Sequence, residues 1–240
     1  MKICVVMPAY NEESGIGEFL SELNESLAIW SPAFIVIDDC SSDGTAQAVD
    51  KLRRSGIDAM AVRNESNAGH GPSTCRALSE GLKAGVDLVV AVDGDGQFYG
   101  SDLARVVQLA IDAGCDVVEG VRRHRGDPIY RRFVSLVTRL LVFSKSRKFP
   151  LDANTPLRVY RPEILQRLLE AVDKEGLVPN LAISVLVRRW NVRVESVEVE
   201  SIPRRGAEKT GTTWGKSRRQ LPSRRFVKFC FRAVRDFARV

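Results

Sequence analysis

Residues 88–97, LVVAVDGDGQ, constrain the fold more than any other stretch of the chain. Five consecutive apolar residues, three of them Val, indicate a buried strand. Asp93 and Asp95 follow directly, and each precedes a Gly. Ligands of open α/β sheets bind at the carboxyl ends of strands, and paired carboxylates are ligands for Mg²⁺ or Mn²⁺, which usually bring substrate phosphates with them. The stretch favours an enzyme that holds a metal–diphosphate.

Strand and helix signals alternate through the first half of the chain. Apolar runs predict strands at 2–7, 34–37, 58–63, 88–92 and 116–119, and helical periodicity predicts helices at 14–27, 43–53, 72–83 and from 102 onward. This order predicts an α/β fold with a mostly parallel, twisted sheet and helices on both faces. Polar residues follow four successive strands, which places them along one rim. The alternative is that these loops are polar only because loops usually are. Agreement among four successive strand ends favours the rim.

Beyond residue 120 the pattern weakens. Helices are expected at 130–143, from Pro162, and at 181–190, and a strand at 192–199. We therefore divide the chain into one domain, residues 1–200, and a basic tail, residues 201–240. The end of the tail has apolar residues at helical spacing, which predicts an amphipathic helix that either lies in a membrane interface or docks on its own protein.

Charge is unevenly placed. The net charge of +6 divides into +10 for the tail, which has 12 Lys or Arg and 2 Asp or Glu, and −4 for the first 200 residues. A basic tail suggests a polyanionic partner: an anionic membrane, a phosphorylated substrate or nucleic acid. No recognisable nucleic-acid module accompanies it, so no nucleic-acid partner is expected.

Two further features bear on where the protein works. Five scattered cysteines without CxxC spacing argue against a zinc site or disulfide framework and favour a reducing cytoplasm. No apolar run approaches the roughly 18 residues of a membrane-spanning helix, and the N-terminus resembles a first strand more than a signal peptide.

Candidate site residues follow from these positions. At the end of the second strand, Asp39 is suited to a ribose or base edge. Asp93, Asp95 and Gln97 supply oxygen donors for a metal. The glycine-rich residues 67–71 indicate either a phosphate-approaching loop or a plain one. Four residues could hold phosphate through charge-assisted bonds or form only a solvated basic face: Arg122, Arg123, Arg131 and Ser135.

Four motifs in order resemble family 2 glycosyltransferases: PAYNEE at 8–13, VIDDCSSDGT at 36–45, NAGHG at 67–71 and DGDGQ at 93–97. The first 165 residues are most similar to the dolichyl- or polyprenyl-phosphate mannosyltransferase branch. Gly94 stands where Ala is usual in that branch, and residues 152–158 replace a Gly-Phe-Arg segment. These departures bear on the sugar and the acceptor more than on the fold.

The resemblance implies a GT-A fold, a nucleoside-diphosphate sugar donor and Mg²⁺ or Mn²⁺ as cofactor. It implies nucleotide binding by Pro8, Tyr10, Glu12, Asp39 and Asp93, and metal binding by Asp93, Asp95 and Gln97. Asp95, Arg122, Arg131 and Ser135 would act in catalysis, with Arg122 and Arg123 left as alternatives. Arg123, Arg204 or Arg205 would bind the acceptor.

The hypothesis is inverting transfer of a sugar to a polyprenyl phosphate or another phosphorylated lipid. An ionised phosphate needs no strong base, which agrees with the lack of an obvious one after Asp95. The alternative is a saccharide, protein or small-molecule hydroxyl acceptor, with Asp152 or Glu175 as base; a non-catalytic nucleotide-sugar binder also stays open. A lipid acceptor would place the protein peripherally at the cytoplasmic face of the membrane. A membrane-embedded partner protein is then one option.

Overall fold

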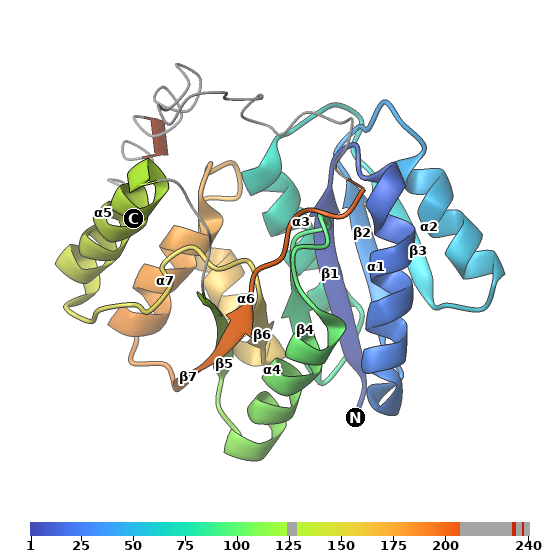
Figure 1. Cartoon of the computed structure of the whole chain (residues 1–240). Helices are drawn as coiled ribbons and strands as arrows, with labels where there is room; N and C mark the ends of the chain where they lie inside the picture. The colour runs from blue at the N-terminus through green and yellow to red at the C-terminus, as the bar shows by residue number, and fades with distance from the viewer. Residues whose placement is uncertain (124–128, 207–231, 234–236, 238–240) are drawn as a thin grey trace.

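A computed structural model describes residues 1–123, 129–206, 232, 233 and 237 (Figure 1). Its centre is a seven-stranded sheet in the order β3-β2-β1-β4-β6-β5-β7. The strands are β1 (Ile3–Ala9), β2 (Ala33–Asp38), β3 (Ala59–Arg63), β4 (Leu88–Ala91), β5 (Val117–Arg123), β6 (Arg158–Tyr160) and β7 (Val194–Glu200). All neighbours pair in parallel except β6, which is antiparallel to both β4 and β5. The predicted α/β sheet is confirmed.

Helices cover both faces of the sheet, as expected. They are α1 (Glu13–Ser26), α2 (Thr45–Arg54), α3 (His70–Lys83), α4 (Gly100–Ala113), α5 (Ile129–Ser146), α6 (Pro162–Ala171) and α7 (Pro179–Arg189), with a short 3₁₀ turn, η1 (Ala28–Trp30). Side chains of β1 alternate between the two faces because successive strand residues point to opposite sides. Val5 packs in a core with α1, α2 and α4, while Val6 packs in a core with α3, α6 and α7.

The sequence pattern does not predict strand β6. It has only three residues, and its buried RVY sequence lacks the length and alternation that would distinguish it from a loop. Its insertion between β4 and β5 separates the parallel strands β1–β4 from the parallel pair β5–β7. Helix α5 packs on α7, beyond this second part of the sheet (Figure 1).

The amphipathic helix expected at the end of the tail falls almost entirely outside the described residues. Phe237, which is described, packs in a small core with Val142, Leu181 and Val185. None of the helices in the described ranges has the length and apolar character needed to cross a membrane.

Candidate nucleotide and metal site

The carboxyl ends of β1, β2 and β4 meet at one edge of the sheet. The parallel register sets Ala9 of β1 beside Asp38 of β2 and Val6 beside Ala91 of β4. Loops that leave these strands therefore emerge side by side, as the sequence predicted for the polar rim. A hydrogen bond of 3.1 Å from the Gly94 amide to the Pro8 carbonyl ties the acidic turn to the end of β1.

The acidic turn holds its two carboxylates close together. The amide of Gln97 donates to Asp95 Oδ1 at 3.3 Å, and Gly96 adopts a left-handed φ of 66°, which closes the turn after Asp95. Burial and, second, the negative charge of Asp93 raise the pKa of Asp95 to about 7. Without a cation the turn therefore disfavours two charged carboxylates at once.

His70 opens α3 at the same edge. Its Nε2 lies 3.8 Å from Asp93 Oδ1, a distance that places a weak donor beside the acidic turn but outside hydrogen-bond range. A single histidine in a glycine-rich loop gives no functional signal in the sequence, so His70 could not be identified there. Its position at the start of α3 is the feature that brings it here.

The donor set of the turn fits a divalent cation that is shared with a substrate. In the described part of the chain, no three His, Cys, Asp or Glu side chains are grouped to hold a metal ion. Asp93 and Asp95 supply two carboxylates, and Gln97, whose amide nitrogen donates to the Ile202 carbonyl at 3.2 Å, adds an amide oxygen. A hard cation held by one or two carboxylates keeps the rest of its coordination sphere for phosphates and water.

Asp39 is committed to the loop that follows β3. Its carboxylate accepts hydrogen bonds from Asn64 Nδ2 (2.7 Å), the Ala68 amide (2.8 Å) and the Gly69 amide (2.9 Å). The NAGHG motif thus folds around Asp39, so a ligand role for this carboxylate would use whatever acceptor capacity these bonds leave. Gly71 serves packing, because a Cβ there would stand 2.1 Å from the Gly176 carbonyl oxygen.

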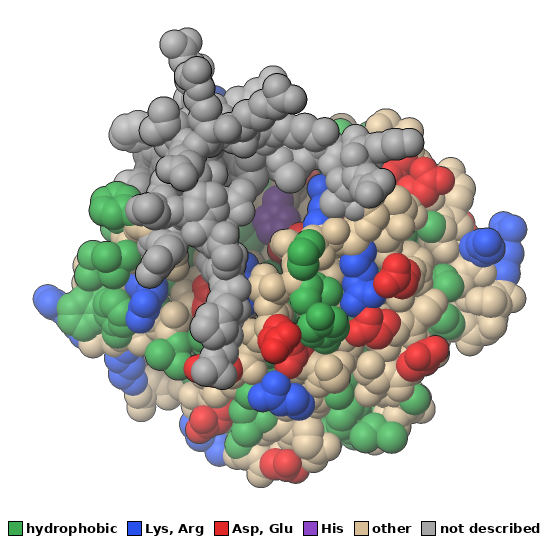
Figure 2. All heavy atoms as spheres, viewed as in Figure 1, with side chains coloured by type: hydrophobic (Ala, Val, Ile, Leu, Met, Phe, Trp, Pro, Cys, Tyr) green, Lys and Arg blue, Asp and Glu red, His purple; other side chains and the backbone are tan. Residues whose placement is uncertain are grey.

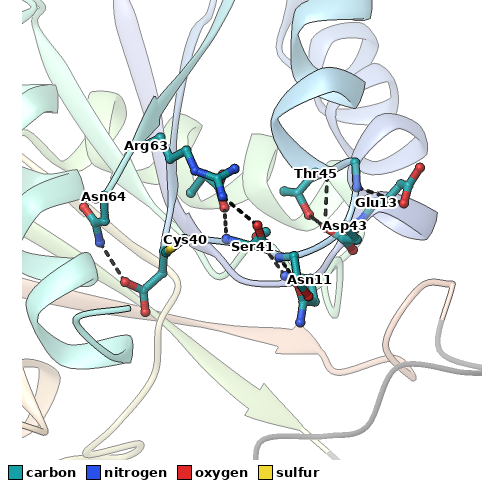
Figure 3. Close-up of polar contacts among 12 residues, drawn as sticks. Asn11, Glu13, Cys40, Ser41, Asp43, Thr45, Arg63 and Asn64 are labelled. Carbon is teal, nitrogen blue, oxygen red and sulfur yellow. Dashed lines mark hydrogen bonds and ion pairs between the residues drawn. The ribbon is translucent and has the colours of Figure 1, made fainter. Parts of the chain in front are cut away.

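The loops after β1 and β2 are linked to each other (Figure 3). The amide of Asn11 donates to Ser41 Oγ at 3.0 Å. Asp43 accepts from the Thr45 amide at 3.0 Å, and from the Glu13 amide at 3.1 Å, so one carboxylate satisfies amides at the starts of α1 and α2. Tyr10, for which the family resemblance implies a role in nucleoside binding, stands about half exposed beside this link.

Glu12 and Arg204 form an ion pair across 192 residues of sequence. Arg204 Nη2 lies 2.6 Å from Glu12 Oε1, its Nε donates to Oε2 at 2.9 Å, and Nη2 also donates to the Asn11 carbonyl at 3.2 Å. Burial raises the pKa of Glu12 to about 7, against the lowering effect of Arg204. The charge of Arg204 also opposes the rise in the pKa of Asp95, so one guanidinium acts on both acids.

Residues 201–206, here termed the return segment, lie along the acidic turn. The Ile202 amide donates to the Gln97 carbonyl at 3.1 Å, and the Arg205 amide donates to the Asp95 carbonyl at 3.2 Å. The side chain of Arg205 turns away from Glu12 toward α1, where Nη1 donates to Glu18 at 2.9 Å and Nη2 pairs with Glu22. The structure thus separates the two arginines: Arg204 faces the site and Arg205 anchors the segment.

The arginines after β5 are less completely placed. Arg122 donates to Asp152 from Nε (2.8 Å) and Nη2 (3.2 Å), and Nη2 also reaches the Asn154 carbonyl at 2.9 Å. The side chains of Arg123 and Arg131 lie outside the described residues. Ser135 is half-buried on α5, and its carbonyl accepts a bond from Thr138 Oγ1.

The two candidate bases, Asp152 and Glu175, lie in different environments. Asp152 is buried in its ion pair with Arg122, whereas Glu175 is exposed.

Comparison with known proteins relates the chain to a sequence family and to solved structures. The family model described as glycosyl transferase family 2 matches residues 4–169. The undecaprenyl-phosphate 4-deoxy-4-formamido-L-arabinose transferase of Salmonella choleraesuis is 29% identical over 201 residues, which are 83% of this chain and 61% of the relative. The chain thus spans about three fifths of the length of such curated relatives.

Solved structures share the fold at low identity. Mannosyl-3-phosphoglycerate synthase from Rubrobacter xylanophilus superposes with a TM-score of 0.68 at 20% identity, over 100% of this chain and 73% of that one. Glucosyl-3-phosphoglycerate synthase from Mycobacterium tuberculosis, in complex with Mn²⁺, UDP-glucose and phosphoglyceric acid, also gives 0.68 at 20% identity, over 99% of this chain and 79% of that one.

Proposed function

The chain belongs to glycosyltransferase family 2, and from that premise we propose that it moves a sugar from a nucleoside-diphosphate donor to a polyprenyl phosphate with inversion at the anomeric carbon. The observation that carries the proposal is the rim where Glu12, Arg204 and the Asp93–Gln97 turn meet at the ends of β1 and β4. The similarity to an undecaprenyl-phosphate sugar transferase supports the choice of acceptor.

Donor binding is assigned to the rim. Asp93, Asp95 and Gln97 would hold Mg²⁺ or Mn²⁺, which as a Lewis acid stabilises the charge that grows on the leaving diphosphate. Pro8, Tyr10, Glu12 and Asp39 border the same edge and would receive the nucleoside. The backbone bonds between the return segment and the acidic turn hold the carboxylates in place before the donor arrives.

The proposed transfer needs no base from the protein. An oxygen of the acceptor phosphate forms the new bond to the anomeric carbon, and the bond from that carbon to the diphosphate oxygen breaks with its electron pair leaving on the nucleotide. The phosphate is already ionised near neutral pH, so no proton must be removed from it. Arg204, and Arg122 with Arg123, Arg131 and Ser135 on the β5–α5 side, are the groups proposed to hold acceptor and diphosphate charge.

The position of Asp152 favours this acceptor over a hydroxyl. A hydroxyl acceptor needs a base, and Asp152 is the buried candidate, but its carboxylate accepts two hydrogen bonds from Arg122. Taking a proton would cost Asp152 its charge attraction to the Arg122 guanidinium. Under the proposal the Arg122–Asp152 pair instead orients the guanidinium for phosphate.

Product analysis tests the proposal. The purified chain is mixed with polyprenyl phosphate, Mn²⁺ or Mg²⁺, and a panel of UDP-, GDP- and dTDP-sugars, and products are identified by mass spectrometry. We expect one glycosyl-phosphoprenol and its nucleoside diphosphate, and a loss of about a thousandfold or more in turnover for Asp95→Asn. Asp50→Asn, an exposed change on α2, is the control.

Two results would contradict the proposal. Glycosylation of a hydroxyl acceptor, abolished by Asp152→Asn while Mn²⁺ and nucleotide still bind, would move the function to the alternative acceptor class. Full activity of Asp95→Asn would remove the metal role of the acidic turn. The proposed place of work, at the cytoplasmic face of a membrane and with or without an embedded partner protein, is tested by adding membranes to the same assay.

A further inference from the structure

Bulky apolar side chains are exposed mainly on one short stretch of the described chain. Eleven large hydrophobic residues are exposed in the described ranges, and six of them lie between residues 133 and 151. Their exposure runs from 40% for Phe143 to 65% for Phe133. The six are Phe133, Leu136, Leu140, Phe143, Phe149 and Leu151. Single exposed hydrophobic residues are ordinary, but a contiguous group marks an interaction site.

Helix α5 gives the group its geometry. The first four residues recur at intervals of three, four and three, so they share one face of the helix. The opposite face is already used, because Val142 is fully buried in the core that includes Leu181 and Val185 of α7. Figure 2 shows hydrophobic side chains gathered on the side of the molecule where α5 lies in Figure 1.

The loop after α5 extends the same surface. The rings of Phe143 and Phe149 lie 6.0 Å apart, and the Arg139 guanidinium stands 4.5 Å from the centroid of Phe149. Arg139 also donates from Nε to the Pro150 carbonyl at 3.0 Å, which fixes the loop against the helix. Helix and loop therefore present one apolar surface, here termed the α5 patch, and not six unrelated side chains.

Charge within the segment that carries the patch has a single sign. Between residues 133 and 151 there are four cations and no acidic residue: Arg139, Lys145, Arg147 and Lys148. Apolar side chains interspersed with Lys and Arg match the boundary of an anionic bilayer, where the apolar groups enter the acyl region and the cations meet lipid phosphates.

We propose that the α5 patch docks the protein on an anionic lipid bilayer. The patch ends at Leu151, and the next residue, Asp152, pairs with Arg122, so docking would bring the bilayer surface beside the proposed acceptor groups. The choice of a lipid partner rests on the proposed function, whereas the exposure and charge of the patch do not.

Vesicle sedimentation tests the docking without any donor or acceptor. The full chain is spun with sucrose-loaded vesicles of phosphatidylcholine, with and without phosphatidylglycerol. We expect binding to the anionic vesicles, weakened by salt, and a loss of about tenfold or more in partitioning for Leu140→Asp/Phe143→Asp. The matched control is Ile29→Asp/Met60→Asp, which adds the same charge at two exposed apolar residues elsewhere and should bind like the parent chain.

Two outcomes would overturn the inference. Equal vesicle binding by the patch variant and the parent chain, with both folded by circular dichroism, would exclude docking through α5. A dimer in light scattering that Leu140→Asp/Phe143→Asp dissociates would assign the patch to a second copy of the chain. Because vesicle binding needs no turnover, a chain that docks but makes no glycolipid would contradict the proposed function and leave the docking intact.

Discussion

At the residue scale, Asp95 lies in an environment that disfavours its charged form. Its carboxyl is largely buried beside Asp93, and its pKa is raised to about 7. Either a bound proton or a bound cation can neutralise this buried negative charge. Enzymes place acids in such surroundings when a bound ion supplies the missing positive charge, because the ion then binds more strongly than it would to solvated carboxylates.

The raised pKa predicts how stability without metal depends on pH. The unfolded chain loses the Asp95 proton near 3.8 and the folded chain near 7, so between these values the folded state holds more protons and the free energy of unfolding falls as pH rises. Glu12, also raised to about 7, contributes in the same direction. Asp95→Asn should therefore flatten the decline without abolishing it, as measured by urea unfolding across this pH window.

The control for this prediction is Asp50→Asn, whose exposed carboxylate pairs with Arg53 on α2. It should leave the pH profile parallel to that of the parent chain. A parallel profile for Asp95→Asn as well would show that Asp95 is not the group responsible. Adding Mn²⁺ with a nucleoside diphosphate should restore stability at the alkaline end of the window for the parent chain and for Asp50→Asn, but not for Asp95→Asn.

At the scale of elements, the sequence predicted what local patterns determine. Buried strands such as β4 and helices such as α1 were found near their observed bounds, since their periodicity is set by the core on which they pack. The rim followed from the parallel order, because strand ends that point the same way must meet. The short strand β6 and its antiparallel direction could not be predicted, since three residues carry no period.

Side-chain partners were harder to predict than positions. Nothing local to Asp39 indicates that backbone amides of residues 68 and 69 would bind its carboxylate, and nothing near Arg122 indicates Asp152. Such pairs depend on where distant segments meet in space. The sequence could therefore nominate the rim but could not distinguish Arg204 from Arg205.

A buried charge network joins β5, β6 and α7 and carries the next prediction. Glu119 and Arg158 are fully buried, with Arg158 Nη2 3.3 Å from Glu119 Oε1 and Arg188 Nη2 2.7 Å from Oε2. Arg158 Nη1 also donates to the Asn180 carbonyl at 3.1 Å. Glu119→Gln would leave two guanidinium groups with no acid between them, so we expect a loss of about 3–5 kcal/mol in the free energy of unfolding.

The matched control is Asp116→Asn on the approach to β5. Asp116 pairs with the exposed Arg193 at 3.3 Å, so its loss should cost about 1 kcal/mol or less. Both are measured by urea unfolding with circular dichroism. Glu119→Gln/Arg188→Gln should recover part of the loss, because it removes one unpaired cation. Equal stabilities for Glu119→Gln and Asp116→Asn would contradict the role assigned to the network.

At the scale of the whole molecule, the site depends on residues that lie far apart in sequence. The return segment comes back from β7 to the acidic turn, about a hundred residues earlier in the chain, and Arg205 fastens it to α1 through Glu18 and Glu22. The Arg205 guanidinium also lies 5.4 Å from the centroid of the Phe19 ring, and its Nε donates to the Gly96 carbonyl at 3.1 Å. One side chain thus braces the turn, the helix and the segment together.

Arg205→Met tests this brace because Met keeps an apolar stem and removes the charged bonds. We expect hydrogen exchange at the Ile202 and Arg205-position amides to accelerate by about tenfold or more, as expected when charge-assisted bonds that hold a local unit are lost. Affinity for Mn²⁺ with nucleoside diphosphate should fall in parallel, since the same amides fasten the carbonyls of Asp95 and Gln97. Arg193→Met, at an exposed pair, should change neither. Unchanged exchange at residue 202 in Arg205→Met would mean that the backbone bonds alone hold the segment, and that the distant arginine is not what organises the acidic turn.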